Sequence, residues 1–230
     1  MYLSRIELNR YRSETRKALG SPQIMHASVM SSFPCIKTEE AGRVLWRLDS
    51  LGPSMYVLVQ SPSKPDFTHM VDQFGWPSSD QRWDTLEYDG FLSKIENGQE
   101  WKFRLTANPT RKITENGKKM VAAHVTAEQQ KRWLLDRCVS NGFSIPSIGD
   151  DHAFDIVSRR LVDFRREGKT VSIQYTSYEG VLKVEDADLL RKCMLNGIGR
   201  AKAYGCGMMT VARRWSAMVP LARRYRSSPA

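Results

Sequence analysis

The sequence has no apolar run that approaches the roughly 20 residues needed to span a bilayer. Its amino terminus also lacks the basic head and apolar core of a signal peptide. The composition, 41% hydrophobic and 26% charged, is typical of a folded globular protein rather than a disordered or fibrous one. We therefore expect the chain to fold and to work in the cytoplasm.

Metal-binding and nucleophilic signatures are missing as well. The four cysteines are scattered, with no C-x-x-C pair and no histidine at ligand spacing: Cys35, Cys138, Cys193 and Cys206. Asp150, Asp151 and Asp155 are close in sequence, but no matching set of acids occurs elsewhere. No G-x-S-x-G elbow or Cys-His signature is present. We predict reduced, packed thiols, no metal site and no cofactor.

Acidic residues are absent from the carboxyl-terminal part, where seven cations and no carboxylate lie between Arg200 and Ala230. The whole chain carries a net charge of +10, which favours a polyanionic partner through Coulombic steering. Charge alone does not choose RNA over DNA. The basic tail over 213–230 is either a disordered extension or one that contacts RNA or a partner subunit.

A glycine-rich stretch, N-G-I-G-R-A-K-A-Y-G-C-G-M-M over 196–209, contains four glycines and two cations. Its spacing matches neither G-x-x-x-x-G-K-[ST] nor G-x-G-x-x-G, so a nucleotide-cofactor loop is not expected. Two interpretations stay open. The glycines can close a helix and lead into a last strand, or they can let the backbone approach an anion. For the second, the candidate contacts are Gly197, Gly199, Arg200 and Lys202.

Strand and helix patterns alternate in the same order twice. The first set comprises a strand over 2–9, a helix opened by Ser21-Pro22, a hairpin of strands over 44–49 and 55–60, a helix over 67–74 and a strand over 85–95. This is the βαββαβ order of a ferredoxin-like unit. The cation-rich segment over 9–19 is expected to be a solvated loop.

Asn97-Gly98 marks a boundary after the first unit. The second set comprises a strand over 101–107, a basic loop over 111–119, a helix opened by Thr126, long strands over 154–164 and 170–184, a helix over 186–195 and a strand over 208–211. We predict an α+β protein with tandem ferredoxin-like (RRM-like) domains over 1–96 and 97–212, the second containing the glycine-rich loop, and a tail over 213–230.

Three segments together resemble one known family. They are M-Y-L-S-R-I-E-L at the amino terminus, F-R-L-T-A-N-P-T in the middle, and D-L-L-R-K-C-M-L-N-G-I-G-R-A-K-A-Y-G-C-G-M-M-T-V-A near the end. The resemblance is to the CasE family, the CRISPR-RNA-processing endoribonucleases of type I-E Cascade. It implies recognition of the CRISPR repeat stem-loop, cleavage at the 3′ base of the stem, and retention of the mature guide RNA with the other Cascade subunits. A non-catalytic RNA-binding subunit of the same architecture is the alternative.

RNA can be cut without a metal when its own 2′-OH attacks the adjacent phosphate. The reaction needs a group that takes the 2′ proton, a group that protonates the 5′ oxygen and cations that stabilise the phosphorane, and histidine suits either proton role. From spacing alone, each of the four histidines is more typical of a packed or surface residue, and we expect this of His69, His124 and His152. The family resemblance implies the catalytic role for His26, in Q-I-M-H-A.

The chain departs from the family three residues before this histidine, where relatives commonly have a tyrosine as a second catalytic group. Here the residue is Gln23, whose amide can donate a hydrogen bond but cannot exchange a proton near neutral pH. Candidate substitutes for the second role are Tyr11, Ser28, Arg200 and Lys202.

A cationic hairpin is predicted around 159–169, with Asp163 and Glu167 as its acids. Its cations are Arg159, Arg160, Arg165, Arg166 and Lys169. Family proteins use a hairpin of the second domain to hold the repeat stem-loop, so we predict that these residues bind RNA. A general RNA-recognition module is a third interpretation, but the K/R-G-F/Y-G/A-F-V motif that would indicate one is absent.

Overall fold

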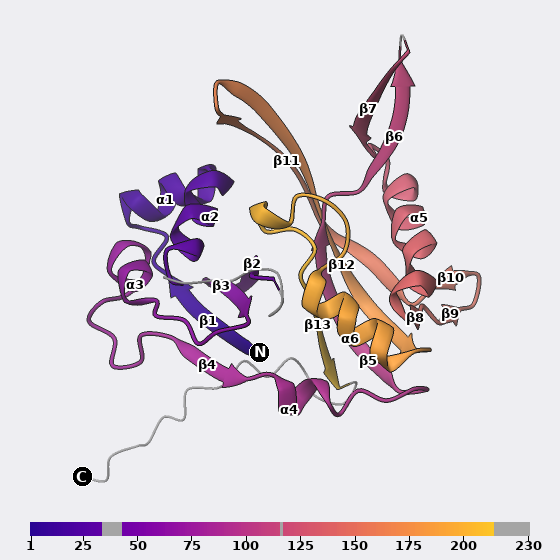
Figure 1. The fold of residues 1–230 in the computed structure, drawn as a ribbon, viewed down its shortest axis with the longest axis horizontal. Helices are drawn as coiled ribbons and strands as arrows, with labels where there is room; N and C mark the ends of the chain where they lie inside the picture. Colours follow the sequence, from indigo (N-terminus) through magenta and orange to yellow (C-terminus); the bar gives the residue numbers. More distant parts are fainter. Residues whose placement is uncertain (34–42, 116, 214–230) are drawn as a thin grey trace.

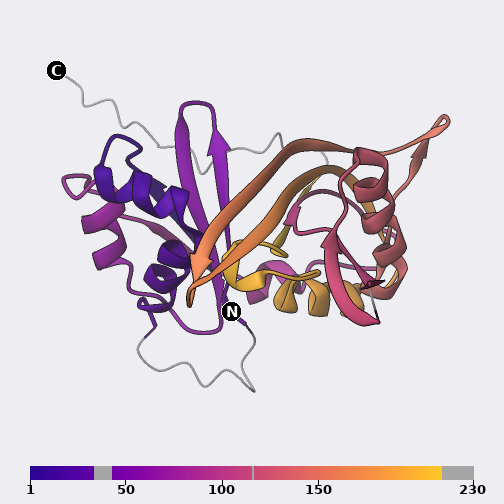
Figure 2. The ribbon, with the colours of Figure 1, turned by 90° about the horizontal axis from the view of Figure 1, so that it is seen from above.

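The computed structural model describes residues 1–33, 43–115 and 117–213, and the chain forms two α+β units that lie side by side (Figures 1 and 2). The first unit has a four-stranded antiparallel sheet in the order β2-β3-β1-β4. Its strands are β1 (Tyr2–Leu8), β2 (Leu45–Leu51), β3 (Ser54–Ser61) and β4 (Asp84–Glu87). Its helices α1 (Ser13–Gly20), α2 (Pro22–Met30) and α3 (Thr68–Phe74) bury their apolar side chains against this sheet.

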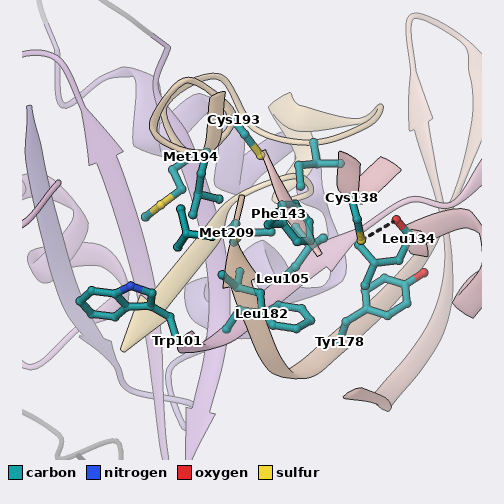
Figure 3. Close-up of a cluster of buried hydrophobic side chains, with 14 of the residues drawn as sticks. Trp101, Leu105, Leu134, Cys138, Phe143, Tyr178, Leu182, Cys193, Met194 and Met209 are labelled. Atoms are coloured by element: carbon teal, nitrogen blue, oxygen red, sulfur yellow. Dashed lines mark hydrogen bonds between the residues drawn. The ribbon is translucent and has the colours of Figure 1, made fainter. Parts of the chain in front are cut away.

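The second unit repeats the strand order. Its main sheet runs β11-β12-β5-β13, all antiparallel, with the short strand β8 beside β12. The strands are β5 (Glu100–Ala107), β8 (Phe143–Ser144), β11 (Phe154–Arg166), β12 (Lys169–Val184) and β13 (Met209–Arg213). Helices α5 (Ala127–Cys138) and α6 (Ala187–Asn196) contribute Leu134 and Met194 to its core, against Leu105 and Leu182 of the sheet (Figure 3). Both units therefore have the ferredoxin-like strand order, as predicted.

Two helix starts follow the signals in the sequence. Pro22 occupies the first turn of α2, where its missing N–H costs nothing, and Ser21 precedes it in an extended conformation. Thr126 forms a capping box at α5, because its side chain accepts from the backbone of Gln129 while the Gln129 side chain accepts from the backbone of Thr126.

The cations of the segment over 9–19 predicted a loop. The segment contains helix α1 instead. Thr15 and Ala18 are buried on its inner side, and the Thr15 hydroxyl donates to the Phe74 carbonyl at 3.0 Å. The cations occupy the solvent side, and Lys17 pairs with Glu14. The loop was predicted because two small buried residues give a weak helical periodicity, and the cluster of cations around them is the stronger feature of the sequence.

The expected closing strand over 85–95 exists as β4 but is shorter than predicted, because β4 ends at Glu87 and a short helix α4 (Asp89–Leu92) follows. Tyr88, Leu92 and Ile95 turn away from the first sheet and pack into the core of the second unit. These side chains precede the predicted domain boundary at 96/97. The chain therefore crosses to the second core before Asn97.

The expected basic loop over 111–119 is a hairpin of β6 (Thr110–Glu115) and β7 (Lys118–Ala123) that projects from the second unit (Figure 1). Gly117 has a φ of +74°, which suits the second residue of a tight hairpin turn. The Asn-Gly pair at 116–117 is a standard hairpin signal that the charge of the segment obscured. Shorter elements complete the unit: η1 (Val139–Asn141), β9 (Ser147–Ile148), β10 (Asp151–His152) and η2 (Lys202–Tyr204).

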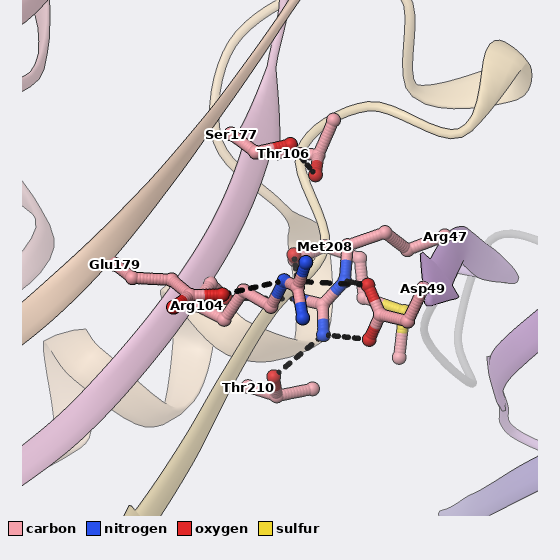
Figure 4. A network of polar contacts seen from close by, with 8 residues as sticks. All are labelled: Arg47, Asp49, Arg104, Thr106, Ser177, Glu179, Met208 and Thr210. Carbon is pink, nitrogen blue, oxygen red and sulfur yellow. Dashed lines mark hydrogen bonds and ion pairs between the residues drawn. The ribbon is translucent and has the colours of Figure 1, made fainter. Parts of the chain in front are cut away.

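A buried arginine ties the two units together. Arg47, 1% exposed on β2, donates to the carbonyls of Arg104 and Met208 at 2.9 and 3.0 Å, and its guanidinium forms an ion pair with Asp49 (Figure 4). Arg104 in turn contacts Asp49 and Glu179. Burial acts to raise the pKa of Asp49, but the charge and hydrogen bonds of Arg47 outweigh it and lower the pKa overall. The first unit is thus anchored directly to β5 and to the start of β13.

Within the described residues, no helix is both long and apolar enough to cross a membrane.

Candidate active site

His26 lines a hollow between the two units. Helix α2 and the residues just before β2 form one wall, and the glycine-rich loop after α6 forms the other. The hollow measures about 760 Å³. We call it the His26 hollow, and its lining residues are His26, Met30, Arg43, Val44, Gly199, Arg200, Ala201, Lys202 and Ala203. The structure therefore brings together the predicted catalytic histidine and the predicted contacts Gly199, Arg200 and Lys202.

The glycine-rich loop has the shape that its sequence requires. Gly197 ends α6 with its N–H on the Cys193 carbonyl, so the helix-ending interpretation is confirmed. A Cβ at Gly199 would lie 2.9 Å from the indole of Trp133, and one at Gly205 would lie 2.7 Å from that of Trp46. Both glycines have positive φ. They therefore let the loop lie flat on two tryptophans, one from each unit.

Trp46 also holds the loop by a hydrogen bond. Its indole N–H donates to the Ala203 carbonyl at 3.0 Å, while Gln60 of β3 donates to the carbonyls of Met194 and Leu195 at the end of α6. The loop is thus fixed to the unit that contains α2. This attachment keeps Lys202 and Ala203 opposite His26.

The charge around His26 is positive. Burial, and then the charge of Arg166, lower the pKa of the His26 imidazole below its ordinary value. Burial, and then Arg43, likewise lower the pKa of Lys202. No carboxylate is among the described residues that line the His26 hollow. The histidine is therefore neutral near pH 7, the form that accepts a proton.

A tyrosine that sequence reasoning did not select lies beside this histidine. The rings of Tyr204 and His26 meet edge to face, with centroids 6.1 Å apart. The Tyr204 hydroxyl accepts a hydrogen bond from Arg166 Nη1 at 2.9 Å. Tyr204 belongs to the glycine-rich loop, far from His26 in sequence, so only its place in that loop could have drawn attention to it.

The other candidate partners of His26 differ in position. Gln23 lies one turn before His26 on the same face of α2, and its Oε1 is shielded from solvent with no hydrogen-bond partner among the described residues. Tyr11 is 78% exposed, and neither Tyr11 nor Ser28 is among the residues that line the His26 hollow. The Ser28 carbonyl accepts a hydrogen bond from His69 Nε2.

The predicted hairpin exists as β11–β12, and its tip reaches α2 (Figure 2). Its cations do not share one surface, however. Arg159 donates to the Gln130 side chain and the Val125 carbonyl, and Arg160 lies over the Tyr175 ring and lines a separate hollow of about 390 Å³. Alternate strand residues face opposite sides, which separates neighbouring cations. The remaining members lie at the tip: Arg165 and Lys169, both exposed, and Arg166, which bonds Tyr204.

A second groove continues from the His26 hollow and was not predicted. It measures about 810 Å³, lies between the β6–β7 hairpin and α5, and shares Gly199 and Arg200 with the His26 hollow. We call it the hairpin groove. Its other lining residues are Thr110, Arg111, Lys112, Val121, His124, Glu128, Gln129, Arg132, Trp133, Asp136 and Arg137. The Asn-Gly turn signal together with the adjacent cations could have indicated it.

The cysteines and the other histidines that the structure describes lie outside the His26 hollow. Cys138, Cys193 and Cys206 are buried free thiols, and burial raises the pKa of Cys138 and that of Cys193 to about 12, which makes them poor nucleophiles. His152 is exposed, and His124 lies in the hairpin groove. Within the described part of the chain, no group of three or more histidine, cysteine and acidic side chains is arranged so that it could hold a metal ion. Cys35 and the tail beyond Arg213 lie outside the described residues.

Known proteins resemble this chain along most of its length. A model of the family described as "CRISPR associated protein" matches residues 1–213. The chain is 28% identical over 223 residues to "CRISPR-associated endoribonuclease Cse3" of Thermus thermophilus, covering 92% of this chain and 100% of the relative. It is 30% identical over 128 residues to "CRISPR system Cascade subunit CasE" of Escherichia coli, covering 52% of this chain and 61% of the relative.

A solved structure of "CRISPR endoribonuclease Cse3 bound to 19 nt RNA" superimposes with a TM-score of 0.76 at 26% identity, over 92% of this chain and 97% of that one. Its fold agrees with the tandem ferredoxin-like architecture, and the family match and the two sequence relatives agree with the resemblance that the sequence showed. The chain therefore belongs to the CRISPR-associated protein family, in its CasE/Cse3 group.

Proposed function

We propose that this chain is the endoribonuclease that processes precursor CRISPR RNA, and that it cuts at the 3′ base of the repeat stem-loop without a metal ion. The observation that carries this proposal is the His26 hollow, where a neutral histidine faces three cations and no carboxylate among the described residues. Relatives of the chain are named as an endoribonuclease and as a Cascade subunit. We place the reaction in the cytoplasm, together with the transcript.

In the proposed reaction, His26 takes the proton of the 2′-OH, and the 2′ oxygen attacks the adjacent phosphorus. The bond from phosphorus to the 5′ oxygen then breaks, which leaves a 2′,3′-cyclic phosphate and a 5′-OH. Arg200 and Arg43 stabilise the added negative charge of the phosphorane. Lys202 donates the proton that the 5′ oxygen gains, since its lowered pKa makes that proton easier to release.

The RNA follows the cationic surface that joins the two hollows. The cut strand lies in the His26 hollow, passes Gly199 and Arg200, and continues along the hairpin groove past Arg111 and Lys112. The tip of β11–β12, with Arg165 and Lys169, contacts the backbone of the stem. Basic side chains at these places neutralise phosphates, which is the main source of affinity for RNA. The product stays bound and joins the other Cascade subunits.

Gln23 favours a second candidate function. Because this residue replaces the tyrosine that relatives commonly have, the chain could bind the repeat stem-loop in Cascade without cutting it. Cleavage of a repeat hairpin by the full chain discriminates the two functions.

The test uses the full chain and a CRISPR repeat hairpin RNA in EDTA. We expect cleavage with 2′,3′-cyclic phosphate and 5′-OH ends, because the 2′-OH is the nucleophile. A deoxyribose at the nucleotide just upstream of the cut should block cleavage and leave the stem bound. Dependence on added magnesium, or cleavage of the deoxy-substituted RNA, would contradict the proposed chemistry.

A further inference from the structure

Tyr204 stands between a catalytic candidate and a cation. On one side its ring meets the imidazole of His26 edge to face, at 69° and with centroids 6.1 Å apart. On the other side its hydroxyl accepts from Arg166 Nη1 at 2.9 Å. Residues from three separate elements, α2, η2 and β11, therefore meet around this phenol.

Tyr204 is itself held firmly. It is 8% exposed, its ring packs against Phe164 with centroids 4.9 Å apart, and its carbonyl accepts from the Tyr175 hydroxyl at 2.7 Å. Its backbone N–H donates to the Ala201 carbonyl. A ring fixed in this way can orient its neighbours, because it loses no further conformational freedom when they bind.

His26 has few other restraints. Its Nδ1 is shielded from solvent and has no hydrogen-bond partner among the described residues. Within the described part of the chain, no carboxylate or carbonyl therefore fixes the imidazole through Nδ1, although catalytic histidines are commonly fixed in this way. The edge of Tyr204 is the ring contact that the structure gives this imidazole.

Arg166 would be mobile without Tyr204. Its side chain is 52% exposed, and its other hydrogen bond is to Glu167, the next residue and itself 80% exposed. Arg166 follows Phe164 on the same side of β11, whereas Arg165 faces the opposite side. The Tyr204 hydroxyl therefore fixes the position of the guanidinium relative to His26.

We propose that Tyr204 is a positioning residue of the cleavage reaction, which orients the His26 imidazole with its ring and holds Arg166 beside it with its hydroxyl. This role rests on the proposed catalytic function of His26. It brings a neutral base and a fixed cation to the same phosphate, although they come from different units of the chain. Tyr204 also places a tyrosine beside His26 in a chain that has Gln23 where relatives commonly have a tyrosine.

The charges facing His26 support this role. Arg43, Arg200 and Lys202 come from the walls of the His26 hollow, and Arg166 comes from β11 with Glu167 bonded to it. Burial contributes most to the lowered pKa of His26, and Arg166 contributes the charge effect. If Arg166 is released, the pKa of His26 should rise towards its ordinary value, because a like charge has moved away.

The test measures the pKa of His26 by NMR titration of the histidine-labelled full chain without RNA. Tyr204→Phe, which keeps the ring packing, and Arg166→Gln should each raise this pKa, and the double variant should raise it no further than Arg166→Gln alone. Two matched controls should leave it unchanged: Tyr11→Phe, which removes an exposed hydroxyl, and Arg165→Gln, which removes a neighbouring charge on the opposite side of the strand.

The second measurement is the single-turnover cleavage rate of a repeat hairpin against pH. Tyr204→Phe should shift the acidic limb of the profile to higher pH and slow cleavage about twofold or more at the pH of the parent's half-maximal rate, with affinity within about twofold. An unchanged His26 pKa and an unchanged limb in both Tyr204→Phe and Arg166→Gln would overturn the role of Tyr204. Full activity of His26→Ala would instead overturn the proposed function, and the titration separates the two failures.

Discussion

At the scale of single residues, the arrangement around His26 depends on side chains that are distant in sequence. The histidine comes from α2, Lys202 and Tyr204 come from the glycine-rich loop, and Arg166 comes from the end of β11. The family resemblance was needed to select His26, because its helical position alone is equally typical of a packed residue. Apart from its place in the glycine-rich loop, nothing in the sequence indicated Tyr204, since its proposed role comes from a contact between two units that no local pattern encodes.

Gln23→Tyr tests whether the replaced tyrosine limits the reaction. We expect the variant to bind the repeat hairpin with unchanged affinity and to cut it at least about tenfold faster in single turnover, because a proton-transfer partner contributes about 10²- to 10⁴-fold. Tyr11→Phe, at an exposed position outside the His26 hollow, should cut at the parent rate. An unchanged rate in Gln23→Tyr would contradict this expectation and would mean that Lys202 already supplies the proton transfer that the tyrosine supplies in relatives.

At the scale of elements, hairpins define where RNA is expected to bind. The long β11–β12 pair was predictable because two extended apolar patterns flank a turn with Gly168, whereas β6–β7 was missed because its charges suggested a loop. Helix α1 was missed for the same reason. In each case a few buried or turn-forming residues decided the structure, and the exposed cations, which dominate the composition, did not.

Charge removal on the hairpin groove tests the proposed RNA path. Arg111→Gln with Lys112→Gln should weaken binding of a repeat hairpin, and the slope of log K against log salt should lose about 0.7 to 0.9 in magnitude for each phosphate contact removed. The charge-matched control is Lys64→Gln with Lys94→Gln, two exposed lysines outside both hollows. An equal loss of slope in the control would show that the effect reflects net charge and not a defined path.

At the scale of the whole molecule, the two units act together because buried polar contacts fix their relative position. The tandem ferredoxin-like fold could be predicted from the order of strands and helices, since that order is local information. The relative placement of the units could not, because it depends on Arg47, a buried cation on a strand that otherwise indicates only a hairpin. Neither the amino-acid composition nor the hydrophobic periodicity of a strand shows that one of its arginines is buried and fully hydrogen-bonded.

Arg47→Met tests this coupling. We expect the free energy of unfolding to fall by about 3 to 5 kcal/mol, because Asp49 would lose its main partner and the carbonyls of Arg104 and Met208 would lose their donor. Arg82→Met, which breaks a more exposed pair with Asp72, should cost less than about 1 kcal/mol. Denaturant unfolding of both variants makes the comparison, and similar losses would show that Arg47 is not a specific link.

The acid stability of the parent should also reflect Asp49. Its pKa is lowered in the folded chain, so its contribution is complete above the ordinary aspartate pKa and is lost as pH falls through the lowered folded value. Arg47→Met should lose stability mainly at neutral pH and much less at strongly acidic pH, where Asp49 is protonated in both proteins. A difference between the two proteins that stays constant with pH would contradict this account of the pair.

The most direct measurement of the central claim is single-turnover cleavage of a repeat hairpin by the full chain and by His26→Ala in EDTA, with affinity measured in parallel. We expect the parent to cut and His26→Ala to lose at least about 10²-fold in rate with affinity within about twofold, because the lost group transfers a proton and does not anchor the stem. A His26→Ala variant that cuts as fast as the parent would contradict the assignment of His26 as the base of the reaction.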